Sequence, residues 1–353
     1  MSTSRPSAIG GYDDWPATWR AGPVVSGDAV TTELAEMLGV LAPPKAEPIE
    51  VDRWHHDGLV TTELSWRTAF GPPTRGWLVR PDDDRTLPGV LALHCHAGVK
   101  HCGAERLVTT REPSPGACQL RATLYEEQAL ADRLARQGFA VLAHDTFAWG
   151  SRGFTFDPPP WRLRKTRATY DAMAAEHEAT VAKYAGVMGT SFAGAVAHDD
   201  LTALSVLAAM PSVDPGRLGV VGFSGGGGRA VHLTALAPEI TASVVVCMMS
   251  TFAAMFPAYL DAHSWLLATP GIGRDKEWPE YAVARGLHHQ LVLYAEDDEL
   301  FPRQGMHDAD TLLRNRFEGA RGNYRGVVLP GPHRFDRAMQ DLAADFLTDT
   351  LAR

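Results

Sequence analysis

The sequence predicts an α/β protein with a mostly parallel central sheet, antiparallel strands at its N-terminal edge and helices on both faces. Short, wholly apolar runs recur from residue 88 onward, which is typical of strands covered on both faces. Helical patterns separate several of these runs, as parallel crossovers require. Before residue 88, alternating apolar and polar segments joined by turn residues indicate antiparallel strands.

The elements follow in order along the chain. Residues 1–47 are predicted to be an N-terminal extension with one amphipathic stretch at Thr32–Leu41, and residues 48–353 to be the main domain. Antiparallel strands are expected near Ile49–Val51, Leu59–Leu64 and Gly76–Val79. Buried strands are expected at Val90–Leu93, Ala140–Ala143, Leu218–Val221, Val244–Val246, Leu291–Tyr294 and Val327–Leu329. Helices are expected at Leu124–Arg136, Asp200–Met210 and Ala338–Leu351.

Two segments are too long for simple crossovers. Residues 151–194 and 250–286 are predicted to be helical insertions, and long connections of this kind are often functional. Their aromatic residues either pack the insertions themselves or line a substrate pocket. We take Phe252 and Trp265, together with Trp149 just past a predicted strand, as candidate substrate-binding residues.

Composition excludes several classes of protein. Of 353 residues, 45% are hydrophobic and 21% charged, which excludes global disorder. The net charge of −9 argues against binding to nucleic acid or to an anionic membrane. Four cysteines in so long a chain do not make a disulfide scaffold. No apolar run approaches a membrane span or follows Met1–Pro6 as in a signal peptide, so we expect a cytoplasmic protein.

The sharpest motif is Gly222-Phe223-Ser224-Gly225-Gly226, which lies between a predicted strand and a predicted helix. G-x-S-x-G in this context predicts a nucleophile elbow, in which small neighbours allow a strained turn to expose the serine. The alternative is a glycine-rich phosphate loop. It is disfavoured because no Lys follows as in a P-loop and the G-x-G-x-x-G spacing is absent.

A serine nucleophile needs a base, and the base needs an orienting acid. Only His307 and His333 follow the last acidic loop, Glu296–Glu299. His307 lies at a predicted helix start, whereas His333 follows the last predicted strand, where a sheet presents side chains to a neighbouring elbow. We therefore predict His333 as the base. Composition alone does not choose among the four carboxylates.

From about Pro88 onward the chain resembles the α/β-hydrolase superfamily, and within it the dienelactone-hydrolase-like and acetyl-xylan-esterase-like families. The resemblance is carried by these segments: His94-Cys95-His96-Ala97-Gly98, Asp145 with Gly150-Ser151-Arg152, Val213–Arg217, the elbow and Ala295–Pro302. It implies an α/β-hydrolase fold. The family pattern G-x-x-D-x-x-x-P, with Ala295 in the glycine place, implies Asp298 as the acid. Dienelactone hydrolases proper carry Cys at the elbow, where this chain has Ser224.

Acyl transfer also requires an oxyanion hole of two backbone N–H groups. One is expected from Gly225, directly after the nucleophile, and the other from Cys95, His96 or Ala97. The loop His94–Cys102 holds five potential metal ligands, but their spacing is not that of a zinc site, so we expect neither a metal nor a cofactor.

These features predict a serine hydrolase that cleaves a small or medium carboxylic ester through an acyl-enzyme. The same triad could serve a C–C bond hydrolase or an amidase or peptidase, because each reaction passes through an oxyanion. A non-catalytic binding protein with this fold is the third interpretation. The expected partner is a small-molecule ester, and the sequence leaves open a homo-oligomer.

Overall fold

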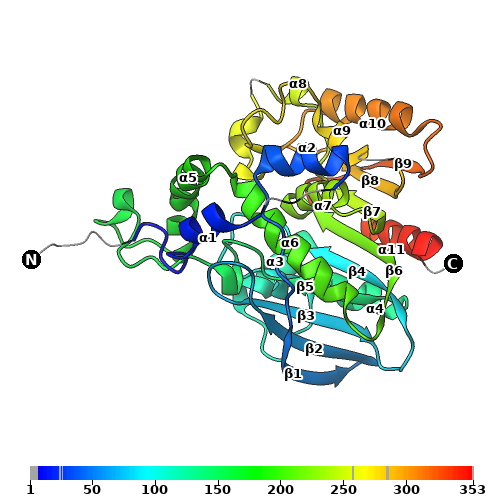
Figure 1. Cartoon of the computed structure of the whole chain (residues 1–353). Coiled ribbons are helices and arrows are strands. Elements are labelled where there is room, and N and C mark those ends of the chain that lie inside the picture. Colours follow the sequence, from blue (N-terminus) through cyan, green and yellow to red (C-terminus); the bar gives the residue numbers. More distant parts are fainter. Residues whose placement is uncertain (1–6, 24, 26, 257, 284–285, 352–353) are drawn as a thin grey trace, which may run out of the picture.

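A computed structural model describes residues 7–351 except 24, 26, 257, 284 and 285. Its centre is a nine-stranded sheet with the strand order β1-β2-β3-β5-β4-β6-β7-β8-β9, shown in Figure 1. The segment Met1–Pro6, in which we expect no signal peptide, lies outside the described residues.

The sheet is mixed, as predicted. Strands β1, β2 and β3 pair antiparallel, and β3 also joins β5 antiparallel. All later pairings are parallel. The strands are β1 (Ile49–His56), β2 (Leu59–Trp66), β3 (Thr74–Pro81), β4 (Leu87–Leu93), β5 (Ala140–His144), β6 (Val213–Phe223), β7 (Ile240–Val246), β8 (His289–Ala295) and β9 (Tyr324–Leu329). Each predicted apolar run lies within one of them, which confirms the fold class.

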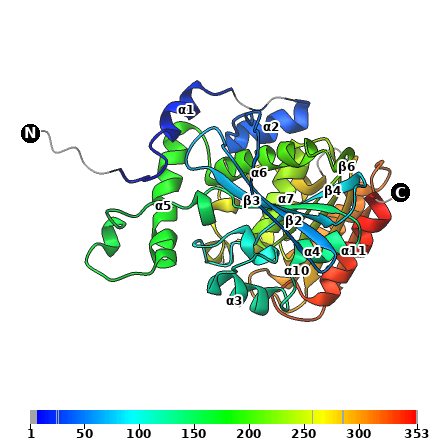
Figure 2. The ribbon, with the colours of Figure 1, turned by 90° about the horizontal axis from the view of Figure 1, so that it is seen from below.

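Helices cover both faces of the sheet (Figure 2). One face carries α2 (Ala29–Leu38), α6 (Phe192–Ala208), α7 (Gly225–Leu236), α9 (Trp278–Val283) and α10 (Arg303–Phe317). The other carries α4 (Leu130–Arg136) and α11 (Arg337–Leu351). The remaining helices are α1 (Trp15–Ala21), α3 (Pro115–Leu124), α5 (Tyr170–Met188) and α8 (Phe252–Met255), with 3-10 turns at Ala104–Leu107, Gly150–Arg152, Trp161–Leu163, Leu260–Ala262 and Trp265–Leu267.

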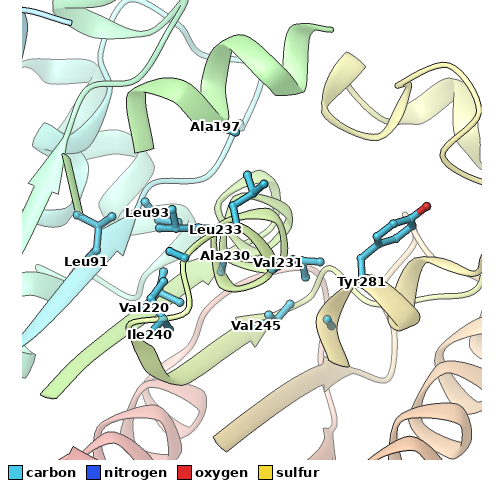
Figure 3. Packing of buried hydrophobic residues seen from close by; sticks show 14 of the residues in the cluster. Leu91, Leu93, Ala197, Val220, Ala230, Val231, Leu233, Ile240, Val245 and Tyr281 are labelled. Carbon is cyan, nitrogen blue, oxygen red and sulfur yellow. The ribbon is translucent and has the colours of Figure 1, made fainter. Parts of the chain in front are cut away.

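The two faces receive alternate side chains of each buried strand. In β4, Leu91 and Leu93 pack toward α7, whereas Val90 and Ala92 pack toward α4. Figure 3 shows side chains of α7 gathered against the strands beneath it. This packing seats the N-terminus of α7 at the carboxyl ends of β4 and β6, where the candidate site lies.

The predicted helix at Leu124–Arg136 is wrong in its extent. The chain leaves α3 at Leu124 and enters α4 only at Leu130. Glu126 and Glu127 between them have positive φ angles of 48° and 62°, which a right-handed helix cannot accommodate. The other predicted helices are present as α6 and α11. The side chain of Ser191 caps α6 by accepting a hydrogen bond from the N–H of Gly194 (2.9 Å), so α6 begins before the predicted Asp200.

The segment before residue 48 packs against the rest of the chain. Tyr12, Trp15 and Trp19 are buried, and the ring of Trp15 lies 5.6 Å from that of Phe70 and 5.0 Å from that of Phe147. Helix α2 lies on α7. The division of the chain into an extension and a domain stays a prediction.

Both long segments contain helices. Residues 151–194 include α5, and residues 250–286 include α8 and α9. Their status as separate insertions stays a prediction. Within the described residues, none of the helices combines the length and apolar character needed to span a bilayer.

Candidate active site

Ser224 occupies a strained turn between β6 and α7. Its backbone has φ 54° and ψ −125°, a region that side chains other than glycine rarely enter. The flanking glycines allow this turn: a Cβ at Gly222 would clash with the carbonyl of Gly226, and a Cβ at Gly226 would clash with the carbonyl of Leu93. The G-x-S-x-G spacing therefore has a steric cause.

The predicted acid and base meet Ser224 at this edge of the sheet. Asp298 follows β8, and His333 follows β9. His333 Nε2 lies 2.8 Å from Ser224 Oγ, and His333 Nδ1 lies 2.7 Å from Asp298 Oδ2. The Asp298 side chain is fully buried, and its Oδ1 accepts the N–H of Leu300 (3.0 Å). The three side chains form one hydrogen-bonded chain.

The hydrogen bonds fix the protonation pattern of this chain. The Asp298 carboxylate can only accept, so the His333 proton is on Nδ1 and the bare Nε2 accepts the Ser224 hydroxyl. The ring of Phe223 packs 4.9 Å from the ring of His333 and supports its orientation. This arrangement can take a proton from Ser224 and so make its oxygen nucleophilic.

The alternatives that composition left open lie away from Ser224. Glu296 and Asp297 are exposed and pair with Arg303 (3.1 and 2.6 Å). Glu299 is exposed as well. The side chain of His307 is 75% exposed. Of these carboxylates and histidines, only Asp298 and His333 are brought together with the serine.

The backbone N–H groups of Gly225 and His96 belong to segments that lie side by side next to Ser224. The amide nitrogen of His96 lies 3.1 Å from the position that a Cβ of Gly225 would take, so the β4 loop and the start of α7 are in contact. Among the described residues, neither N–H has a protein acceptor. Cys95 and Ala97 were the other two candidates from this loop. The N–H of Cys95 already donates to Tyr125 Oη (3.4 Å), which favours His96 over Cys95. Ala97 has a positive φ of 54°.

A cavity of about 390 Å³ opens at these residues. Besides Ser224, His333 and the β4 loop, its walls come from α3 and from the segments after β7 and β8. Those walls are formed by Leu120, Thr123, Leu124, Met248, Ala262, His263, Ser264, Leu267 and Leu300. The sequence analysis missed these residues. They come from separate segments, and the unusual length of residues 250–286 pointed only to those of them that lie within that segment.

The predicted substrate-binding aromatics are not among the lining residues. Trp149 is buried, with its ring 5.1 Å from that of His96. Phe252 packs on Trp278, with the ring centroids 6.1 Å apart. Trp265 is 39% exposed but lies between cavity residues rather than in the wall. Trp149 and Phe252 are therefore buried packing residues, and none of the three predicted aromatics forms the cavity wall.

The ligand-type side chains of the His94–Cys102 loop do not gather. His94 Nδ1 bonds the carbonyl of Cys95 (3.0 Å), and His101 Nδ1 bonds Asp171 (2.7 Å). In the part of the chain that the structure describes, a single set of three or more ligand-type side chains lies close together. It consists of Cys247, Asp298 and His333, whose possible ligand atoms are within 4.8 Å of one another. Burial, followed by the charge of Asp298, raises the pKa of the Cys247 thiol, so that thiol is neutral.

Residues 75–248 match the sequence model of the dienelactone hydrolase family. The chain is also 24% identical, over 322 residues, to a Bacillus subtilis (strain 168) protein named "Putative hydrolase YtaP", covering 89% of this chain and 96% of that one.

Solved structures share the fold at low identity. Methylesterase BT1017 superimposes with a TM-score of 0.60 at 17% identity, over 96% of this chain and 63% of the methylesterase chain, so the present chain spans less than two thirds of it. Glucuronoyl esterase from Solibacter usitatus gives 0.60 at 14%, over 95% and 91% of the two chains. Acetyl xylan esterase 1 from Thermoanaerobacterium sp. JW/SL YS485 gives 0.52 at 16%, over 97% and 95%. The fold is thus α/β-hydrolase-like, and residues 75–248, just under half of the chain, are similar in sequence to the dienelactone hydrolase family.

Proposed function

We propose that this chain is a serine hydrolase that cleaves small or medium carboxylic esters through an acyl-enzyme. The observation that carries the proposal is the hydrogen-bonded chain Ser224–His333–Asp298, whose Ser224 and His333 line a cavity. The match of residues 75–248 to the sequence model of the dienelactone hydrolase family supports it.

The reaction follows from the positions of these groups. Ser224 Oγ attacks the acyl carbon while His333 Nε2 takes its proton. Asp298 holds the Nδ1 proton and stabilises the imidazolium. The carbonyl oxygen, now negative, accepts hydrogen bonds from the N–H groups of Gly225 and His96. His333 then protonates the leaving alcohol, and a water activated by the same nitrogen releases the acid.

The cavity suits a modest, uncharged substrate. Its volume of about 390 Å³ falls at the small end for ligand pockets, and much of its wall is apolar. The structural relatives include an acetyl xylan esterase and a methylesterase, whose names imply esters with a small acyl or alkyl group. We infer an acetyl or similarly short ester. These names favour an ester over the C–C or amide bond that the same triad could attack.

A panel of p-nitrophenyl esters of increasing acyl length tests the proposal. We expect the acetyl and butyryl esters to be hydrolysed fastest, and Ser224→Ala to lower kcat by about 10⁴-fold or more. Ser264→Ala is the matched control. Ser264 lines the same cavity, but its hydroxyl accepts the N–H of Leu266 (3.3 Å), so its loss should change kcat by less than about tenfold.

The decisive outcomes are distinct. A fluorophosphonate probe should label the wild type and the Ser264→Ala variant but not Ser224→Ala. Activity that survives in Ser224→Ala would remove this serine from the reaction. An untargeted screen in which amides or 1,3-diketones turn over while every ester fails would replace the ester with one of the other bonds.

A further inference from the structure

Helix α5 holds the loop between β4 and the 3-10 turn at Ala104–Leu107. Asp171 and Glu178 lie seven residues apart on α5, and two helical turns place them on the same face. Asp171 Oδ1 accepts the backbone N–H groups of Lys100 (2.8 Å) and His101 (3.0 Å). Its Oδ2 bonds His101 Nδ1 (2.7 Å). This fixes the distal part of the loop to the start of the helix.

Glu178 fixes the part of the loop that lines the cavity. Its Oε1 lies 2.9 Å from His96 Nε2 and also pairs with Lys100 Nζ. His96 Nδ1 accepts the N–H of Gly98 (2.9 Å), so the ring proton is on Nε2 and is donated to Glu178. The His96 ring is thereby held from both sides. The same residue supplies the backbone nitrogen that lies beside Gly225.

Charge and burial both favour this contact. The side chains of Lys100 and Glu178 are only 4% and 11% exposed. Burial raises the pKa of Glu178, but the hydrogen bond from His96 and the charge of Lys100 outweigh burial and lower it to about 2. The Lys100 ammonium also lies 4.5 Å from the centre of the Trp149 ring and 5.0 Å from that of Phe192. Glu178 is therefore an anion at every working pH.

We propose that Glu178 is a positioning residue: through His96 and Lys100 it holds the backbone N–H of His96 where the oxyanion forms. The inference rests on the proposed function. The loop needs such a restraint, because Ala97, directly after His96, has a φ of 54° that a free loop would relax. It also gives α5, which lies within residues 151–194, a role in the reaction.

Two variants separate positioning from folding. Glu178→Gln keeps the size of the side chain and removes its charge. The double variant Lys100→Met with Glu178→Met removes both buried charges together, so neither is left unpaired, and it deprives His96 of its acceptor. The matched control is Glu176→Gln on the same helix, whose side chain is 33% exposed and pairs with the exposed Arg162 (3.4 Å).

We expect kcat for p-nitrophenyl acetate to fall about tenfold in Glu178→Gln and about a hundredfold in the double variant, with KM changed less than about threefold. A trifluoromethyl ketone, which forms an oxyanion adduct with Ser224, should lose affinity in parallel with kcat/KM. Glu176→Gln should match the wild type in both measurements.

The inference is overturned if kcat stays within threefold of the wild type in both Glu178 variants, or if ketone affinity is unchanged while activity falls. The failure of the proposed function looks different. In that case Ser224→Ala retains activity, whatever the Glu178 variants do.

Discussion

At the scale of single residues, His333 lies between Ser224, which is 109 positions earlier in the chain, and Asp298. The geometry of its ring explains how residues so far apart in the sequence can form one site. The hydrogen-bonding nitrogens of an imidazole point in opposite directions, so a base between Ser224 and Asp298 needs its partners on opposite sides of the ring. Ser224 and Asp298 follow β6 and β8 in a parallel sheet, whose carboxyl ends share one edge. The predicted strands therefore indicated the serine, the acidic loop and the histidine, and the family resemblance singled out Asp298 within that loop, whereas the cavity wall had no comparable pattern.

Buried histidines elsewhere make folding sensitive to acid. His232 on α7 packs against Trp278, with the rings 5.2 Å apart. Burial, only partly offset by the charge of Asp200, lowers the pKa of His232 from 6.5 to about 4. The unfolded chain therefore binds the proton more readily than the folded one. Above pH 6.5, His232 is neutral in both states and the folded state keeps its full stability. As the pH falls from 6.5 toward 4, protonation of His232 in the unfolded chain lowers the free energy of unfolding.

His232→Leu should remove this dependence. Between pH 7 and pH 5, the free energy of unfolding of the wild type should fall by about 2 kcal/mol more than that of the variant. Urea unfolding at the two pH values measures the difference. His307→Leu, at a side chain that is 75% exposed, should leave the wild-type difference unchanged. Equal pH dependence in the wild type and His232→Leu would contradict the assignment.

At the scale of elements, the apolar runs predicted β4, β5, β6, β7 and β8 because these central strands are covered on both faces. The run at Val327–Leu329 also predicted a strand, but its expected burial is wrong: β9 lies at the edge of the sheet, and Val328 is 61% exposed. The false helix at Leu124–Arg136 has a different cause. No glycine or proline marks the break after α3. The break is made by tertiary contacts: Gln340 Nε2 donates to the carbonyl of Tyr125 (3.0 Å), and the Arg337 N–H donates to Glu126 (3.0 Å). Contacts 211 or more positions away leave no local pattern in the sequence.

The close approach of α7 to β4 makes a sharp prediction about two glycines of the same helix. A Cβ at Gly226 would clash with the backbone carbonyl of Leu93, which cannot move without disturbing the sheet. At Gly228 the nearest atom is the mobile Cε of Met248, 3.1 Å away. We expect Gly226→Ala to lower the free energy of unfolding by more than about 3 kcal/mol, since it forces backbone apart in the core.

Gly228→Ala is the matched control. Alanine favours a helix over glycine by about 1 kcal/mol, which should offset the small displacement of Met248. Denaturant unfolding of both variants measures the contrast. Equal losses in the free energy of unfolding for the two substitutions would contradict a close contact between α7 and the end of β4.

At the scale of the whole molecule, buried ion pairs and aromatic rings join the first residues to the sheet. Arg152, past the end of β5, pairs with Asp199 of α6 (2.8 Å) and donates to the carbonyl of Phe70 (2.8 Å), and its own carbonyl accepts the hydroxyl of Tyr12. Both members of the ion pair are fully buried. Sequence analysis could treat residues 1–47 only as an extension, because their partners lie on three separate segments.

This packing predicts that the N-terminal segment and the sheet unfold together. Trp15 is fully buried among rings that belong to the main sheet and its connections, so Trp15→Ala should cost about 3–5 kcal/mol. The loss should appear equally in urea unfolding followed by far-UV circular dichroism and in the urea dependence of ester hydrolysis. Trp161→Ala, at a side chain that is 77% exposed, should change the free energy of unfolding by less than about 0.5 kcal/mol in either measurement. A Trp15→Ala variant that keeps the wild-type midpoint for hydrolysis while its circular dichroism shows an earlier, separate transition would mean that the first 47 residues fold on their own.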